Sequence, residues 1–137
     1  MTIPVNLRRQ VIQRAASRCE YCGLSQAGQE AAFHIDHIVP VTARGTTILA
    51  NLALACVSCS LRKGSRQRAL DPHSNVPVEL FHSRRNAWRL HFRWDDNGRL
   101  AGLTPTGRAT VAALSMNRSL AIAIRREEII RGRHPLI

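Results

Sequence analysis

Hydrophobic residues near the start of the chain are spaced as they are on one face of a helix. Leu7, Val11 and Ala15 recur every four positions, close to the length of one helical turn. Pro4 suits the first turn of a helix, because the N–H that proline lacks would have no partner there. The pattern therefore predicts a helix over residues 4–18.

Short apolar stretches separated by a polar loop follow this segment. Residues 32–41 and 52–56 are each brief and mainly apolar, as strands are, and Pro40 should end the pairing of the first. Residues 42–50 form a loop between them. The next segment, residues 58–68, is predicted to be a helix, which gives the order strand, strand, helix.

After residue 87 the pattern alternates between apolar and polar positions. The apolar members are Trp88, Leu90, Phe92 and Trp94, and the polar members are Arg89, His91 and Arg93. A period of two predicts a half-buried strand, with the three polar residues on its exposed face. Asp-Asp-Asn-Gly at residues 95–98 is typical of a hairpin turn, so residues 99–103 are the predicted return strand.

The end of the chain is predicted to be helical. Thr104 followed by Pro105 is typical of a helix start, and this helix should run to about residue 116. A second helix is predicted over residues 120–131, where Gly132 closes it.

These elements define an α+β fold with two parts. The first, residues 1–70, is predicted to be the core, and residues 71–137 form a C-terminal extension, a strand hairpin and two helices packed on that core. The stretch 71–77 is the expected hinge between them.

Composition adds a strong positive charge to this picture. The 137 residues include 20 Lys and Arg against 9 Asp and Glu, a formal net charge of +11, and Lys63 is the one lysine. The guanidinium group of arginine carries a planar set of donors that matches phosphate. We therefore expect a polyanionic partner, with DNA first and RNA second. The charge disfavours an interaction module without a nucleic-acid partner.

No stretch of the sequence has the length of a membrane span. The longest apolar run, residues 48–57, is interrupted by Asn51 and is too short to cross a bilayer. The first residues carry no apolar signal core. We therefore expect a cytoplasmic protein without a membrane partner, whose cysteines are reduced.

All four cysteines occur in two Cys-x-x-Cys pairs, Cys19 with Cys22 and Cys56 with Cys59. Each pair holds two thiolates at the spacing that tetrahedral Zn²⁺ requires, and four sulfurs complete its coordination. A closed site of this kind is structural, because no position is open to activate water. The alternatives are two disulfides, which a reducing compartment opposes, and four unrelated thiols, which the paired spacing opposes.

The segment between the cysteine pairs carries a further set of motifs. They are Asp-His-Ile-Val-Pro at residues 36–40, Asn-Leu at residues 51–52, and Ser60 directly after Cys59, followed by Arg-Lys-Gly at residues 62–64. Together, over roughly residues 18–65, they resemble the HNH (ββα-metal) endonucleases. The resemblance implies a zinc-stapled ββα-metal core preceded by the N-terminal helix. The tail is similar to the extension of small stand-alone bacterial HNH proteins.

The resemblance also implies a metal-dependent endonuclease that hydrolyses phosphodiester bonds in DNA. His37 would be the general base, a role that suits imidazole near neutral pH. Asp36 would be an oxygen ligand for a catalytic Mg²⁺ or Mn²⁺. Asn51 would brace the loop, and Ser60 occupies the position of a second metal ligand. His34, two residues before Asp36, is either an auxiliary ligand or an ordinary polar residue.

Residues of the following helix would contact phosphates that flank the cut. These are Arg62, Lys63 and Arg66. Ser60 departs from the family pattern, which has His or Asn there, and a neutral hydroxyl is a poorer ligand. The alternative function is therefore a weakly active or inactive HNH-fold module that only binds nucleic acid.

The two adjacent residues of the central motif raise a geometric question. In a regular strand, Asp36 and His37 point to opposite faces. If both serve one site, the strand should be irregular there, through a bulge or an early end.

Overall fold

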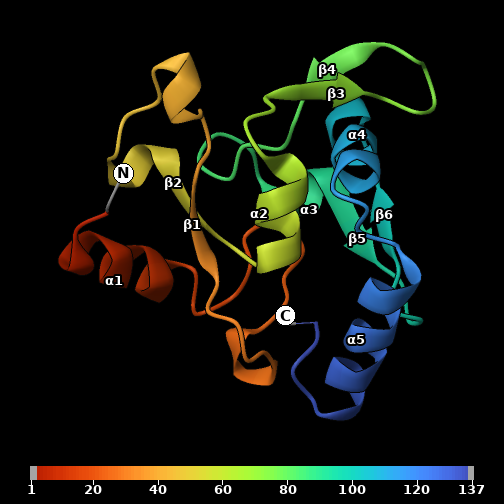
Figure 1. Cartoon of the computed structure of the whole chain (residues 1–137). Helices are drawn as coiled ribbons and strands as arrows, with labels where there is room; N and C mark the ends of the chain where they lie inside the picture. Colours follow the sequence, from red (N-terminus) through yellow and green to blue (C-terminus); the bar gives the residue numbers. More distant parts are fainter. Residues whose placement is uncertain (1–2, 136–137) are drawn as a thin grey trace.

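The computed structural model describes residues 3–135, which form a mixed α+β fold (Figure 1). Within these residues there are five α-helices and three two-stranded antiparallel sheets. In chain order the elements are α1 (Val5–Arg14), β1 (His34–His37), β2 (Leu52–Ala55), α2 (Val57–Lys63), β3 (Arg68–Leu70), β4 (Pro77–Glu79), α3 (Trp88–His91), β5 (Phe92–Trp94), β6 (Leu100–Gly102), α4 (Pro105–Ala113) and α5 (Ser119–Ile130). None of the helices in this part of the chain is long and apolar enough to cross a bilayer.

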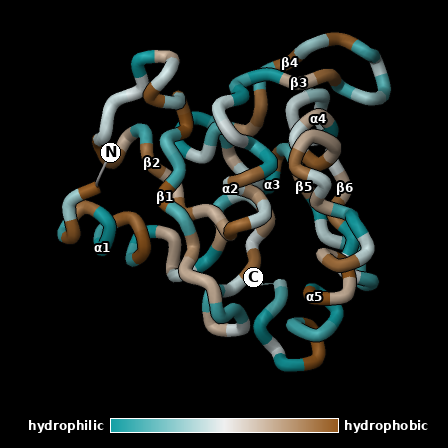
Figure 2. The backbone as a smooth tube through the Cα atoms, viewed as in Figure 1, coloured by the Kyte–Doolittle hydropathy of each residue, from teal (hydrophilic) through white to brown (hydrophobic). Residues whose placement is uncertain are grey.

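The predicted N-terminal helix is present as α1, but it ends at Arg14 rather than at residue 18. Ala16 and Ser17 have φ angles of 52° and 57°, so the helix cannot continue through them. Hydrophobic and hydrophilic positions alternate along α1 (Figure 2). Val11 is fully buried, and the Arg14 guanidinium donates to the carbonyl of Leu52 at 2.5 Å, which fixes α1 against β2.

The predicted order of strand, strand and helix is also present. β1 pairs with β2, with His34 opposite Ala55 and His37 opposite Leu52, and α2 packs on both strands. β1 is shorter than expected. The predicted helix over 58–68 is shorter as well, because Gly64, at a φ of 54°, ends α2 and β3 begins at Arg68.

The segment predicted to be a hinge is instead the turn of the hairpin formed by β3 and β4. Asp71 in this turn is fully buried, and its carboxylate accepts two hydrogen bonds from Arg108 of α4, at 2.9 and 2.8 Å. These bonds hold the pKa of Asp71 well below its usual range. The turn is therefore fixed to α4.

The strand predicted over residues 88–94 is only half correct. Trp88–His91 is a short helix, α3, and only Phe92–Trp94 pairs with the return strand β6. The predicted shared face of Arg89, His91 and Arg93 is therefore wrong. Helical winding brings the Trp88 ring to 5.0 Å from both Phe92 and Trp94, a cluster that a straight strand could not form on one face.

The two C-terminal helices agree with the sequence pattern. The Thr104 side chain accepts a hydrogen bond from Gly107 N at 3.0 Å, and Pro105 occupies the first turn, so α4 starts where expected. α4 ends at Ala113, slightly early, and α5 ends before Gly132, whose φ is 72°.

One hydrophobic cluster joins the two halves of the chain. It contains Val11, Tyr21, Phe33, Ile38 and Leu52 to Leu54 from the first half, and Phe81, Phe92, Leu100, Leu114 and Met116 from the second. Two polar contacts reinforce it: Trp88 Nε1 donates to the carbonyl of Tyr21 at 2.9 Å, and Arg84 forms an ion pair with Glu20. The C-terminal residues thus complete the core around the segment that carries the two cysteine pairs.

Candidate functional site

The four cysteines lie together at the N-terminal end of α2. Their sulfur atoms are all within 4.8 Å of one another, and all four residues are buried. The backbone N–H of Cys22 points to Cys19 Sγ, and that of Cys59 points to Cys56 Sγ, each at 3.4 Å. Each pair therefore forms a tight knuckle whose thiolates are stabilised by main-chain donors.

The donor set fits Zn²⁺. Tetrahedral coordination with Zn–S bonds of about 2.3 Å places the sulfurs about 3.8 Å apart, and Cys22 Sγ lies 3.7 Å from Cys56 Sγ. All four thiols are free, and this separation is far longer than a disulfide bond of about 2.05 Å. The predicted four-cysteine cluster is therefore present, and these are the residues that would hold a structural zinc.

The surroundings of the four thiols affect their ionisation in different directions. Burial raises the pKa of Cys19, whereas hydrogen bonds from Cys19 and Cys22 lower the pKa of Cys56. Alone, the cluster favours only partial ionisation. A divalent cation would let all four sulfurs be thiolates.

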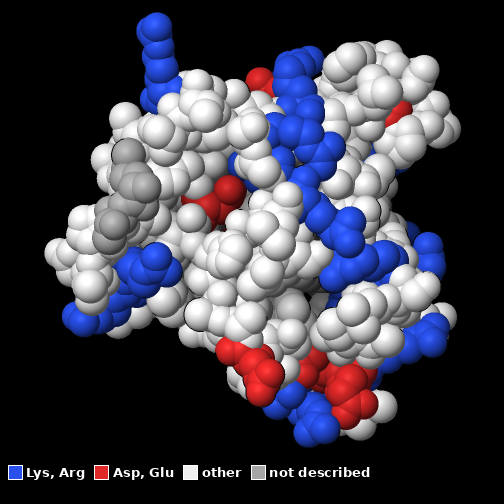
Figure 3. Space-filling view, viewed as in Figure 1, with Lys and Arg blue, Asp and Glu red and all other residues white. Residues whose placement is uncertain are grey.

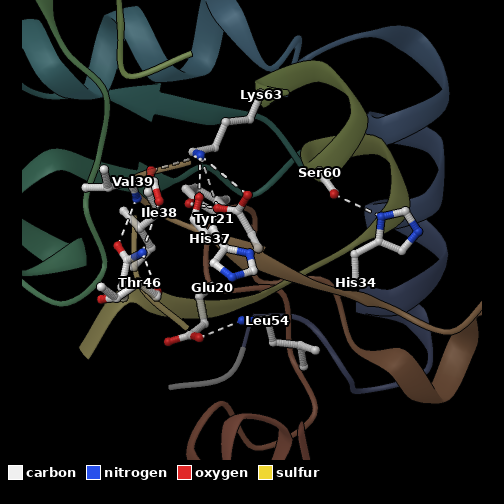
Figure 4. A network of polar contacts seen from close by, with 12 residues as sticks. Glu20, Tyr21, His34, His37, Ile38, Val39, Thr46, Leu54, Ser60 and Lys63 are labelled. Atoms are coloured by element: carbon white, nitrogen blue, oxygen red, sulfur yellow. Dashed lines mark hydrogen bonds and ion pairs between the residues drawn. The ribbon is translucent and has the colours of Figure 1, made fainter. Parts of the chain in front are cut away.

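Asp36 lies in a buried polar cluster between β1 and α2 (Figure 4). Its Oδ2 accepts a hydrogen bond from the Tyr21 hydroxyl at 2.7 Å and lies 3.2 Å from Lys63 Nζ. Lys63 is only 2% exposed and also donates to the carbonyl of Ile38 at 3.1 Å. Burial, followed by the negative charge of Asp36, raises the pKa of Tyr21, so its hydroxyl remains a donor.

His34 and Ser60 form a second pair across the same interface. His34 Nδ1 lies 2.9 Å from Ser60 Oγ, and both residues are half-buried. His34 and Asp36 are two positions apart on β1, and Ser60 and Lys63 are three apart on α2. The two pairs therefore bridge one face of the strand and one face of the helix.

His37 lies on the other side of the strand. Its Nε2 is 2.9 Å from Thr47 Oγ1 in the loop after β1, and its ring points away from Lys63 (Figure 4). The pairing with β2 is regular and contains no bulge, and β1 ends at His37. The structure therefore brings Asp36 together with Lys63 and places the His37 ring apart, at the end of the strand.

Asn51 fixes the loop that carries Thr47. Its amide nitrogen donates to the carbonyls of Val39 and Thr46 at 3.0 and 2.9 Å, and its oxygen accepts from Val39 N at 2.9 Å. Gly45 allows this close path, because a Cβ there would lie 1.7 Å from the Val39 carbonyl oxygen. The loop is thus tied to the end of β1 next to His37.

The three basic residues of α2 and its end differ in exposure. Arg62 and Arg66 are exposed, whereas Lys63 is enclosed with Asp36. Arg66 donates to the carbonyl of Ala113 at 2.9 Å, and its guanidinium forms no ion pair within residues 3–135. Lys and Arg side chains form a band between α2 and α4 (Figure 3).

The contacts of Tyr21 and Lys63 with Asp36 differ from what the motifs predict. Lys63 is predicted to contact phosphate, and no role is predicted for Tyr21. One signal was available: Lys63, the one lysine, is three residues after Ser60 and therefore lies on the same face of α2, which points toward β1.

Lys63→Met should lower the free energy of unfolding by about 3–5 kcal/mol, because it leaves a buried carboxylate without its cation. Combining it with Asp36→Asn should recover much of the loss, since no buried charge then remains. Urea unfolding of the zinc-loaded protein measures both. Arg62→Met is the matched control, and this exposed change should alter stability by less than about 0.5 kcal/mol. Equal stability of Lys63→Met and Arg62→Met would contradict the expected role of the pair.

Comparison with known protein families gives a match for the segment that contains the cysteines and the two polar pairs. Residues 19–66 match the family described as HNH endonuclease. The resemblance inferred from the motifs is therefore confirmed for this segment, which contains all four cysteines and both polar pairs. The match indicates a nuclease-type protein that acts on nucleic acid. No curated protein and no solved structure matches the chain.

Proposed function

We propose that this protein is a metal-dependent endonuclease that hydrolyses phosphodiester bonds in DNA, with β1, β2 and α2 as a ββα-metal core. The observation that carries the proposal is the position of His37, half-buried at the end of β1 beside a loop fixed by Asn51, within the HNH match. The net charge of +11 and the exposed arginines beside α2 support a nucleic-acid substrate.

His37 is the general base of the proposed reaction. When its Nε2–H donates to Thr47 Oγ1, Nδ1 is the unprotonated atom that can accept a proton. Nδ1 takes a proton from water as the water oxygen forms a bond to phosphorus and the bond from phosphorus to the leaving oxygen breaks. The leaving oxygen gains a proton from solvent, and His37 later releases its proton to solvent. Thr47, held by the Asn51 loop, orients the ring.

Three residues would hold the catalytic divalent cation: Asp36, His34 and Ser60. Bound Mg²⁺ or Mn²⁺ supplies positive charge that stabilises the phosphate during the reaction. The Asp36 carboxylate fits this role in part, because Tyr21 and Lys63 use Oδ2 most strongly and Oδ1 retains accepting capacity. Lys63 opposes a second cation nearby, so weak metal affinity is expected.

The four-cysteine site supports this chemistry indirectly. Cys56 caps the start of α2 and Cys59 lies inside the helix, directly before Ser60. A zinc ion with four thiolates has no open position, so its role would be to fix α2 relative to the turn that carries Cys19 and Cys22. That position brings Ser60 and Lys63 opposite His34 and Asp36.

A second candidate function is a DNA-binding module with little or no cleavage activity. Two observations favour it: Ser60 contributes only a hydroxyl, and Asp36 already has a cationic partner. Incubating supercoiled plasmid with Mg²⁺ or Mn²⁺ separates the two functions, because only the nuclease converts it to nicked or linear forms. A gel shift of the same DNA tests binding alone.

Ser60→Asn should lower the Mn²⁺ or Mg²⁺ concentration needed for half-maximal plasmid nicking. The amide oxygen of asparagine is a better metal ligand than a hydroxyl, and the longer side chain reaches further. An added ligand worth about 1.4 kcal/mol would lower it about tenfold. Metal titrations of the parent, Ser60→Asn, Ser60→His and Ser60→Ala make the comparison. A slower Ser60→Asn enzyme at every metal concentration would show that serine is the better residue here.

A further inference from the structure

A small basic cleft lies beside the candidate site, between the end of α2, the hairpin of β3 and β4, and the turn after β4. Its volume is about 170 Å³. Its titratable lining residues are Lys63, Arg66, Arg68, Glu79, His82 and Arg85. Four of these come from residues beyond the HNH match at 19–66. Ile38 and Val39, which directly follow His37, form part of the same lining.

The charges in the cleft are not balanced. Lys63 is paired with Asp36, but Arg66 and Arg68 donate to uncharged main-chain carbonyls, of Ala113 at 2.9 Å and Pro77 at 3.1 Å. Arg85 is exposed and has no hydrogen bond or ion pair from its side chain within residues 3–135. Glu79 offsets one of these three arginine charges, so the cleft remains positive.

The turn that carries Arg85 is rigid before any ligand arrives. Asn86 Oδ1 accepts from His82 N at 2.9 Å, and the His82 carbonyl accepts from Arg85 N at 3.0 Å. The adjacent Arg84 is anchored to Glu20 by an ion pair. A fixed turn lowers the entropy that Arg85 loses when it binds an anion.

His82 adds a neutral donor to this lining. Its Nδ1 accepts the backbone N–H of Arg84 at 3.2 Å, so the ring proton lies on Nε2. Burial, followed by the charge of Arg85, lowers the pKa of His82, which keeps the ring uncharged. The guanidinium groups of the arginines and the Nε2–H of His82 together match the oxygens of a phosphate.

We propose that this cleft binds a backbone phosphate of the nucleic acid, on the Lys63 side of β1. The inference rests on the proposed function, because the position of Ile38 and Val39 relates the cleft to His37. It gives the C-terminal half of the chain a part in substrate binding, through Arg68, His82 and Arg85. The cleft has room for a phosphate group.

The test is the salt dependence of DNA binding by the full chain, without added Mg²⁺ or Mn²⁺. Fluorescence anisotropy of a labelled duplex over a range of NaCl concentrations gives the slope of log K against log[NaCl]. Arg85→Gln should reduce this slope by about 0.9 and weaken binding about eightfold at 0.1 M salt, as expected for one lost phosphate contact. Arg85→Lys, which keeps the charge, should retain most of the slope.

Arg9→Gln is the matched control, because Arg9 is an exposed arginine on α1. This helix lies on the opposite side of the molecule from the hairpin of β3 and β4 (Figure 1). An equal change in both variants would overturn the inference, since it would mean that any surface arginine contributes alike. Competition of DNA binding by inorganic phosphate at constant ionic strength, lost in Arg85→Gln, would support the inference, and a salt slope in Arg85→Gln equal to that of the parent would overturn it. If the parent itself does not bind DNA, the proposed function fails rather than the assignment of Arg85 alone.

Discussion

His37→Ala should cleave plasmid DNA about 10²–10⁴-fold more slowly than the parent while binding DNA with similar affinity. The expected loss is that of a general base, because His37 Nδ1 is the proposed proton acceptor. Binding should persist because affinity rests on arginine contacts to phosphate, whereas the His37 ring lies against Thr47. Single-turnover cleavage and a gel shift on the same preparations measure the two effects.

His73→Ala is the matched control for this experiment. His73 is an exposed histidine in the turn between β3 and β4, on a different hairpin from His37. Its replacement should leave the cleavage rate unchanged. Cleavage by His37→Ala at the rate of the parent would place the base elsewhere or attribute the activity to a contaminant.

Cys56→Ser should lose the bound zinc and with it the cooperative fold. Structural zinc sites contribute about 10–16 kcal/mol of apparent binding free energy, whereas a domain is stable by only about 5–15 kcal/mol. Cys56 is both a predicted ligand and the residue that caps α2, so its loss releases the helix that carries Ser60 and Lys63. Elemental analysis and thermal unfolding followed by circular dichroism measure the two consequences.

Ser58→Ala tests whether any change in this knuckle has the same effect. Ser58 lies between Cys56 and Cys59, and its hydroxyl accepts a hydrogen bond from Arg62 rather than facing the sulfurs. This variant should keep one zinc per chain and unfold near the parent's temperature. Freshly purified parent protein that holds clearly less than one zinc per chain would contradict the assignment of the site.

The parts of the fold that were predicted correctly depend on local rules. The spacing of Cys19 and Cys22 is set by ligand geometry within a few residues, so the cluster followed from sequence. The cap formed by Thr104 and the periodicity of Leu7 and Val11 are also local. Element boundaries were less certain, as the early end of α1 before Ala16 illustrates.

The errors arose where distant contacts decide the conformation. Trp88 alternates with polar residues as a strand residue would, yet its indole donates to Tyr21 and its ring packs on Phe92, which favours a helical turn. The turn at Asp71 looked like a polar linker because its partner, Arg108, is far away in sequence. Neither contact produces a periodic pattern of hydrophobic and polar residues in the sequence.

In the candidate site, too, the local motif was predicted correctly and the contacts between distant residues were not. The motif located Asp36 and His37, but only the structure shows that Lys63 crosses from α2 to neutralise Asp36 while His37 points to Thr47. The helix face that Lys63 shares with Ser60 points toward β1, but the partner on β1, 27 positions away, cannot be identified from a single sequence. The contribution of Arg85 was hidden for the same reason, because its neighbours in the cleft come from three other segments.

The shared hydrophobic core has a consequence for how this protein could be reused. The segment that matches the HNH family depends on residues outside it, since Trp88 and Arg84 hold the knuckle at Tyr21 and Glu20, and Phe81 and Phe92 fill the space beneath. Grafted alone into another protein, residues 19–66 would expose that apolar surface to water and aggregate. An engineer who wishes to transplant this nuclease-type unit must carry the C-terminal half with it, because the recognisable motif is smaller than the unit that folds.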